Sequence, residues 1–166
     1  MRLSPPASTE PDRPAIPASL ARTPLCVLLA LVLLVVATSI ASAERGNARA
    51  LGRLGFRYEH GFGVPQNYDA AVDLYCRGAE RGDPFAQAML GLMYDKGHGV
   101  PQDFVLAYKW LNLAAARAGG RQREVYLRFR DAVASKLSRN EIVAGQQLSL
   151  GWVPGRPVRE VYLGDR

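Results

Sequence analysis

The sequence is poor in the residues from which disulfide frameworks and metal sites are built. Among its 166 residues there are two cysteines and two histidines. Cys26 falls in an apolar N-terminal run, so only Cys76 remains for the rest of the chain and no disulfide can form within it. Helix packing must therefore hold that part together. Cys76 is expected to be a small buried residue on the inner face of a helix, with a cross-link to a partner or second copy as the alternative.

The scarcity of histidine also argues against catalysis and metal binding. His60 and His98 have no Cys, His or Asp at ligand spacing within a helix, so both are expected to be solvated loop residues. No Ser-His-Asp set and no pair of carboxylates can be argued from spacing. The sequence therefore predicts no catalytic residue, no bound metal and no cofactor.

Only one long apolar run is present, and it lies near the N-terminus. Leu25–Thr38 carries no charge, follows Arg2, Arg13 and Arg22, and precedes Ala41-Ser42-Ala43. This pattern predicts a secretory signal peptide over residues 25–43, cleaved after Ala43. The alternative is an uncleaved inner-membrane anchor over the same residues, which are just long enough to cross a bilayer. Residues 1–24 are rich in proline and are predicted to be a disordered n-region or tail. Either alternative places the rest of the chain outside the cytoplasm, in the periplasm or secreted.

Acidic residues are outnumbered by basic ones, 15 to 21, which gives a formal net charge of +6. Five arginines lie close together in the sequence, offset only by Glu124: Arg117, Arg121, Arg123, Arg128 and Arg130. They form either a solvated helix face or a patch that attracts an acidic partner, such as an envelope polysaccharide, a lipid headgroup or an acidic protein. Because export is predicted, nucleic acid is not an expected partner.

What the sequence does contain is an internal repeat. Gly61-Phe62-Gly63-Val64-Pro65-Gln66 recurs 36 residues later as Gly97-His98-Gly99-Val100-Pro101-Gln102. A period of this length is typical of stacked helical repeats. The spacing of apolar and small residues predicts helices over residues 47–60, 68–81, 85–96 and 104–118. In the first helix the core face is expected to carry Ala48, Leu51, Gly52, Leu54, Gly55 and Tyr58.

Turn and capping residues separate these helices. Glycines that can adopt a left-handed conformation, each followed by Val-Pro, predict a sharp reversal in both copies; the structural turn residues are Gly61, Gly63, Pro65, Gly97, Gly99 and Pro101. Helix N-caps are predicted at Asn67, Asp103 and Asp83, and a capping box at Ser138 with Glu141. Gly55 and Gly91 interrupt helices at a cost of about 1 kcal/mol each. They are expected where the paired helix, at Ala71 or Ala107, comes close.

These motifs resemble the Sel1-like repeat, a relative of the tetratricopeptide repeat. They comprise Leu-Gly-x-x-Tyr, Gly-x-Gly-Val-Pro-Gln and the alanines that follow. The resemblance implies an all-α superhelical solenoid of helix-turn-helix repeats, with two repeats and a degenerate capping helix pair, six helices in all. On this interpretation residues 44–150 form the repeat domain and residues 151–166 a C-terminal tail.

The same resemblance implies a scaffold for protein–protein contacts in the cell envelope, with a regulatory role as a further hypothesis and no catalysis. In such arrays the first helices line a concave face, so the predicted binding residues are Arg49, Arg53, Phe56, Glu59, Phe85, Met89, Leu92 and Asp95. Alternatively, Phe85, Met89 and Leu92 only pack against the neighbouring helix.

Two other functions stay open at this stage. One is a small hydrolase or cell-wall-acting enzyme, and the other is a binder of anionic envelope polysaccharide. Self-association through the exposed end of the array, near Leu51, is a further hypothesis. Membrane contact is expected only through residues 25–43, and only if that segment is not cleaved.

Overall fold

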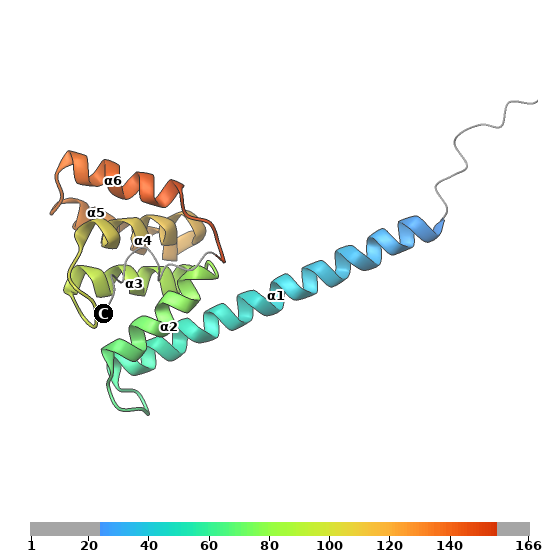
Figure 1. The fold of residues 1–166 in the computed structure, drawn as a ribbon, viewed down its shortest axis with the longest axis horizontal. Helices are drawn as coiled ribbons and strands as arrows, with labels where there is room; N and C mark the ends of the chain where they lie inside the picture. Colours follow the sequence, from blue (N-terminus) through green and yellow to red (C-terminus); the bar gives the residue numbers. More distant parts are fainter. Residues whose placement is uncertain (1–23, 156–166) are drawn as a thin grey trace, which may run out of the picture. The chain divides into compact units, whose positions relative to one another are not determined.

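The computed structural model describes residues 24–155, except for the side chains of residues 24–30 and 36–41. Within that range the backbone forms six helices and no strand (Figure 1). They are α1 (Pro24–His60), α2 (Tyr68–Glu80), α3 (Pro84–Lys96), α4 (Phe104–Arg117), α5 (Gly120–Ala134) and α6 (Arg139–Leu150). The predicted all-α helix-turn-helix architecture is confirmed.

Helix α1 begins far upstream of the predicted start at residue 47. It begins at Pro24, where proline is well tolerated, and continues through a segment without an internal proline. The chain divides into two compact units, residues 1–38 and 39–166, and the repeats belong to the second. Residues 1–23 of the predicted Pro-rich segment and most side chains of segment 25–43 lie outside the described residues. Within the described part, we find no helical stretch with the length and apolar character needed to span a bilayer.

Side-chain caps fix where the repeat helices begin. Asn67, Asp83 and Asp103 each accept a hydrogen bond from the backbone N–H three residues later, at 2.9 Å. At α6 the hydroxyl of Ser138 accepts from the N–H of Glu141, whose carboxylate accepts from the Ser138 N–H. Each cap satisfies N–H groups that have no partner within the helix. All four predicted caps are confirmed.

The two Gly-x-Gly-Val-Pro-Gln turns have the same internal geometry. Gly61 and Gly97 have φ values of 72° and 71°, in the left-handed region that favours glycine. In each turn the glutamine side chain donates to a carbonyl seven residues earlier, Gln66 to Glu59 and Gln102 to Asp95. This bond ties the loop to the end of the preceding helix. It gives a physical reason why glutamine ends the motif in both copies.

Two helical glycines let paired helices approach closely. A Cβ added at Gly55 would lie 3.2 Å from the carbonyl oxygen of Ala71, and one at Gly91 would lie 3.1 Å from that of Ala107. Both distances are tighter than ordinary contact, so glycine is required by packing. The predicted close approach is confirmed in both repeats. The core around these contacts includes the fully buried side chains of Tyr75, Leu90, Met93, Trp110 and Leu111, and Cys76 is buried as predicted.

The core face of α1 differs in part from the prediction. Ala48, Gly52 and Gly55 are buried, but Leu54 is 37% exposed and Leu51 and Tyr58 are only half-buried. Small residues occupy the centre of the contact because the partner helix lies too close for leucine. The larger side chains are displaced to its edges.

The last helix pair packs on the second repeat. Helix α4, the second helix of the second repeat, contacts α3, α5 and α6, so it lies between α3 and the terminal pair (Figure 1). After α6, Trp152 packs edge-on against Trp110 with ring centroids 6.4 Å apart, and the Gly155 N–H donates to the Glu80 carbonyl at 2.7 Å. The beginning of the predicted tail is therefore docked on the domain. Residues 156–166 lie outside the described part.

Candidate functional site

A groove connects the first helices of the three helix pairs. It has a volume of about 330 Å³ and is lined by Arg49, Arg53, Asp83, Pro84, Phe85 and Gln122. The two arginines come from α1, Phe85 from α3 and Gln122 from α5. Arg49, Arg53 and Phe85 were predicted to share this face, and the structure brings them together. We call this feature the first-helix groove.

Aromatic rings extend the surface beside the groove. The ring centroid of Phe56 lies 6.1 Å from that of Phe85, 4.1 Å from His60 and 6.0 Å from Phe62. Phe56 and Phe85 also pack on the core, so part of each ring has a structural role. Phe62 is 56% exposed. The prediction omitted Phe62, although its place in the first Gly-x-Gly turn, beside the end of α1, could have indicated it.

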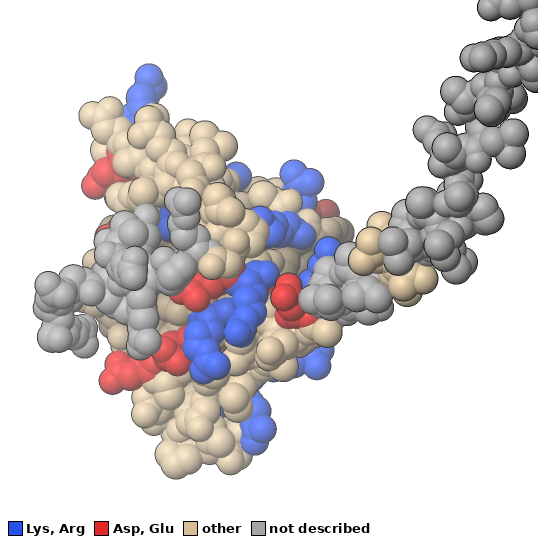
Figure 2. All heavy atoms as spheres, turned by 45° about the vertical axis from the view of Figure 1, so that its right-hand side comes forward, with Lys and Arg blue, Asp and Glu red and all other residues tan. Residues whose placement is uncertain are grey.

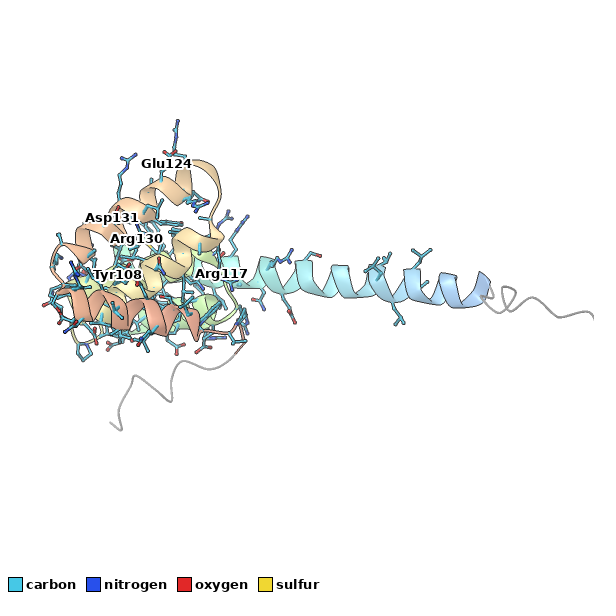
Figure 3. All side chains as sticks on the ribbon, turned by 90° about the horizontal axis from the view of Figure 1, so that it is seen from above. Tyr108, Arg117, Glu124, Arg130 and Asp131 are labelled. Atoms are coloured by element: carbon cyan, nitrogen blue, oxygen red, sulfur yellow. The ribbon has the colours of Figure 1, made fainter. Side chains whose placement is uncertain are left out.

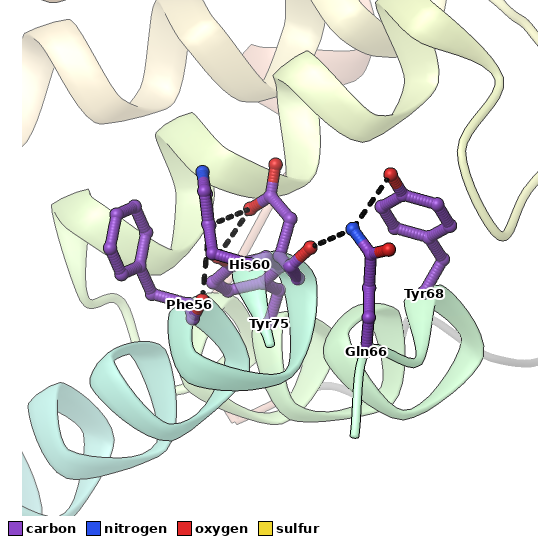
Figure 4. Close-up of polar contacts among 6 residues, drawn as sticks. Phe56, His60, Gln66, Tyr68 and Tyr75 are labelled. Carbon is purple, nitrogen blue, oxygen red and sulfur yellow. Dashed lines mark hydrogen bonds and ion pairs between the residues drawn. The ribbon is translucent and has the colours of Figure 1, made fainter. Parts of the chain in front are cut away.

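Glu59 does not face away from the core, and that prediction is wrong. Its side chain is buried and accepts a hydrogen bond of 2.7 Å from the hydroxyl of Tyr75 (Figure 4). Burial raises the pKa of Tyr75, and the bond to Glu59 raises it further. The hydroxyl therefore remains a proton donor to the carboxylate. The pair joins α1 to α2 within the domain.

The other predicted residues lie along α3. Met89 packs against the core and Leu92 is half-buried. The position of Met89 therefore fits the alternative that its side chain only packs against the neighbouring helix. The carboxylate of Asp95, at the position equivalent to Glu59, accepts from Lys136 Nζ at 2.6 Å. This ion pair joins the second repeat to the loop between α5 and α6.

A second cavity lies next to the groove and is strongly basic. It has a volume of about 580 Å³, and its lining includes four arginines: Arg45, Arg49, Arg81 and Arg117. Asp83 is the one acidic residue in that lining. Figure 2 shows Lys and Arg side chains gathered on one face of the molecule, with acidic side chains at the border of the group. We call the cavity of about 580 Å³ the arginine cavity.

The cavity and the groove adjoin each other. Arg49, Asp83 and Pro84 line both. Asp83 is buried, and its carboxylate accepts from the Ala86 N–H as the N-cap of α3. Burial raises the pKa of Tyr126, and the negative charge of Asp83 raises it further. This carboxylate is therefore held in place where the two hollows meet.

The arginine cluster predicted from sequence proximity is divided by the fold. Arg117, labelled in Figure 3, lies at the end of α4. It lines the arginine cavity. Arg130 pairs with the adjacent Asp131 at 2.6 Å, and both lie on α5. The remaining three are exposed on α5: Arg121, Arg123 and Arg128. These three arginines fit the alternative of a solvated helix face. The arginine cavity, in contrast, is lined by arginines from distant parts of the chain.

The histidines differ from each other. His60 is exposed, and its Nδ1 lies 3.1 Å from the carbonyl oxygen of Phe56 (Figure 4). His98 is half-buried against Tyr68, with ring centroids 4.6 Å apart, so the expectation of a solvated residue is wrong for His98. Within the described part of the chain, no three His, Cys, Asp or Glu side chains come together as a metal site would require.

Comparison with known proteins identifies the repeats. Residues 48–83 and 84–118 each match the Sel1 repeat family. The chain therefore carries two consecutive Sel1 repeats, which confirms the resemblance seen in the turn motifs. Among curated protein sequences, none matches this chain.

Two solved structures share the fold. One is a protective antigen present in uropathogenic Escherichia coli strains and displaying an SLR fold; it has 27% sequence identity and a TM-score of 0.59 over 72% of this chain. The other is a Sel1 repeat protein from Oxalobacter formigenes, with 25% identity and a TM-score of 0.50 over 69% of this chain. The matched region spans 24% of the first protein's chain and 48% of the second's.

Proposed function

Because this chain carries two Sel1 repeats, we propose that it is a non-catalytic scaffold that binds a partner protein through the first-helix groove. Sel1 repeat proteins typically mediate protein–protein interactions. The observation that carries the proposal is the groove itself, in which arginine and phenylalanine side chains from α1 and α3 line one hollow.

The composition of the groove suits protein recognition. Arginine and aromatic residues contribute most of the binding energy in many protein interfaces. Within the described residues, Arg49 and Arg53 take part in no ion pair, so their guanidinium groups are available to a ligand. Phe85 and the exposed Phe62 supply apolar surface nearby. A partner segment can therefore combine polar contacts to α1 with apolar contacts to α3.

Partner capture with the full-length chain as bait tests the groove. Arg53→Glu changes an exposed residue that lines the groove but not the arginine cavity. We expect this variant to capture at least about tenfold less partner than the unchanged chain, because one favourable charge contact becomes repulsive. The matched control is Arg139→Glu at the start of α6, which carries the same charge change on an exposed residue outside the groove. Equal capture by both variants would contradict the proposal.

We propose further that the domain acts in the cell envelope. The support is the sequence of residues 25–43, with its uncharged apolar run and Ala41-Ser42-Ala43. Cell fractionation followed by N-terminal sequencing tests this proposal. A mature chain that begins at Glu44 in the periplasm or medium is the expected result, and an intact chain in the inner membrane would support the anchor instead. Recovery of the intact chain from the cytoplasm would refute export.

No specific observation favours the hydrolase alternative. The polar groups brought together at Glu59 and Tyr75 form a buried contact between α1 and α2. Their geometry is accounted for by helix packing. The polysaccharide alternative concerns the arginine cavity, which is lined by four arginines.

A further inference from the structure

The arginine cavity brings together positive charges from three separate parts of the chain. Arg45 and Arg49 lie one turn apart on α1, Arg81 follows the end of α2, and Arg117 ends α4. Arg81 and Arg117 occupy equivalent positions in the two repeats, so repeat stacking places the ends of two second helices beside α1. A volume of about 580 Å³ is within the range of ligand-binding cavities.

The positive charge in this cavity exceeds what the described residues neutralise. Within those residues, Arg45, Arg49 and Arg81 make no ion pair. The single carboxylate in the lining, that of Asp83, is already occupied as the N-cap of α3. Like charges brought this close repel one another unless a counter-charge is present. An anion in the cavity would supply that counter-charge.

One of the four guanidinium groups is held in place before any ligand arrives. The Arg117 guanidinium carbon lies 4.4 Å from the ring centroid of Trp152, a cation–π contact. A Cβ added at Gly82 would lie 3.0 Å from Arg117 Nη1, so the absence of a side chain there leaves room for this arginine. Burial also lowers the pKa of Arg117, because its hydration is partly removed. An oriented and partly desolvated guanidinium is suited to bind carboxylate oxygens.

We propose that the arginine cavity binds a carboxylate-rich segment of the partner protein, with an adjacent apolar side chain placed on Phe85 in the first-helix groove. This inference rests on the proposed scaffold function and specifies the chemistry of the partner. Continuity of the two hollows through Arg49, Asp83 and Pro84 supports it, since one extended peptide can reach both. A protein ligand is favoured over a polysaccharide or lipid because the aromatic surface lies directly beside the basic cavity.

Fluorescence anisotropy with a rhodamine-labelled peptide of alternating Asp, Glu and Phe residues tests the proposal on the full-length chain. The neutral matched probe has Asn and Gln in place of Asp and Glu. We expect the acidic peptide to bind at low salt, the neutral one to bind at least about tenfold more weakly, and the binding to weaken as salt is added. Equal binding of both peptides, or no binding of the acidic one, would overturn the inference.

Two variants with the same net charge locate the site. Arg49→Gln with Arg81→Gln removes two cavity arginines and is expected to weaken acidic-peptide binding at least about tenfold, because two charge-assisted contacts are lost. Arg128→Gln with Arg139→Gln removes two exposed arginines that line neither hollow, and is expected to change the affinity by less than about twofold. Equal losses in the two variants would show only general charge attraction and would overturn the proposal. Circular dichroism of both variants checks that each remains folded.

Two further probes separate the peptide from other anions. Alginate and phosphatidylglycerol vesicles are each tested as competitors of the acidic peptide, with the same two variants. If either binds through Arg49 and Arg81 while the acidic peptide does not, the cavity serves a polysaccharide or a membrane surface and the proposal is wrong. If the peptide test fails but Arg53→Glu still abolishes partner capture, only the stated ligand chemistry falls and the scaffold function stands.

Discussion

Replacing Gly99 with alanine is expected to lower the free energy of unfolding by about 3 to 5 kcal/mol, whereas the same change at Gly63 costs about 1 to 2 kcal/mol. The two glycines occupy the same place in the two repeat turns and have φ values of 69° and 72°. Backbone strain is therefore the same in both. The difference comes from the neighbours of the added methyl group.

At Gly99 the added Cβ would lie 2.8 Å from the backbone carbonyl carbon and oxygen of Tyr68, the first residue of α2. At Gly63 the nearest atom would be Nη2 of Arg57, at 2.9 Å, and that flexible side chain can move. Urea unfolding followed by circular dichroism at 222 nm measures both variants. Equal losses of stability would show that the second turn does not press on the first repeat as described.

Raising the pH from 7.5 to 9.5 is expected to increase the Lys109-dependent part of the stability by about 2 kcal/mol. Burial lowers the pKa of Lys109 to about 8, from its usual 10.5. Between these values the folded chain has released a proton that the unfolded chain still holds, so unfolding becomes less favourable as the pH rises. Below about pH 8 both states are protonated and the cost of burying the charge is constant.

The matched variant is Lys109→Met, which keeps a long side chain but removes the titrating amine. We expect its stability to lack the rise between pH 7.5 and 9.5, so the difference between the two chains isolates Lys109. Measurements stop at pH 9.5 because Tyr75 and Tyr126 have raised pKa values, and their contribution falls as unfolded tyrosines ionise near pH 10. The same pH profile in both chains would contradict this account.

Local features of the fold were predictable because a few adjacent residues determine them. The caps at Asn67, Asp83 and Asp103 depend on a side chain and the N–H three residues away, and the turns depend on glycine and proline. These interactions do not require knowledge of the neighbouring helix. Their positions in the structure match the predictions.

The orientation of α1 was predicted less well because it depends on a partner helix. The apolar side chain of Leu54 predicts a core position, yet Leu54 is exposed and Glu59 is buried. A signal was present in the spacing: Ala48, Gly52, Gly55 and Glu59 follow one another at four, three and four residues. A stripe of small residues marks the closest contact between helices, and it pointed to Glu59 as its continuation.

The arginine cavity was missed because sequence proximity is a poor guide to spatial proximity in stacked repeats. Arg117 was grouped with Arg121 and Arg123, but its neighbours in the cavity include Arg49 and Arg81. The repeat offset of 36 residues relates Arg81 to Arg117 and could have indicated that the two come together. The contribution of α1 could not be inferred without knowing where that helix lies relative to Arg81 and Arg117.

The central position of α4 has a consequence for how the domain opens. Helix α4 contacts α3, α5 and α6 and contains the fully buried Trp110 and Leu111, so opening its backbone to solvent disrupts more packing than opening a helix with one neighbour. Hydrogen exchange should therefore be slower in α4 than in α5 and α6, each of which packs mainly on α4. The two repeats and the terminal pair would then lose structure as one cooperative unit, with fraying confined to its edges.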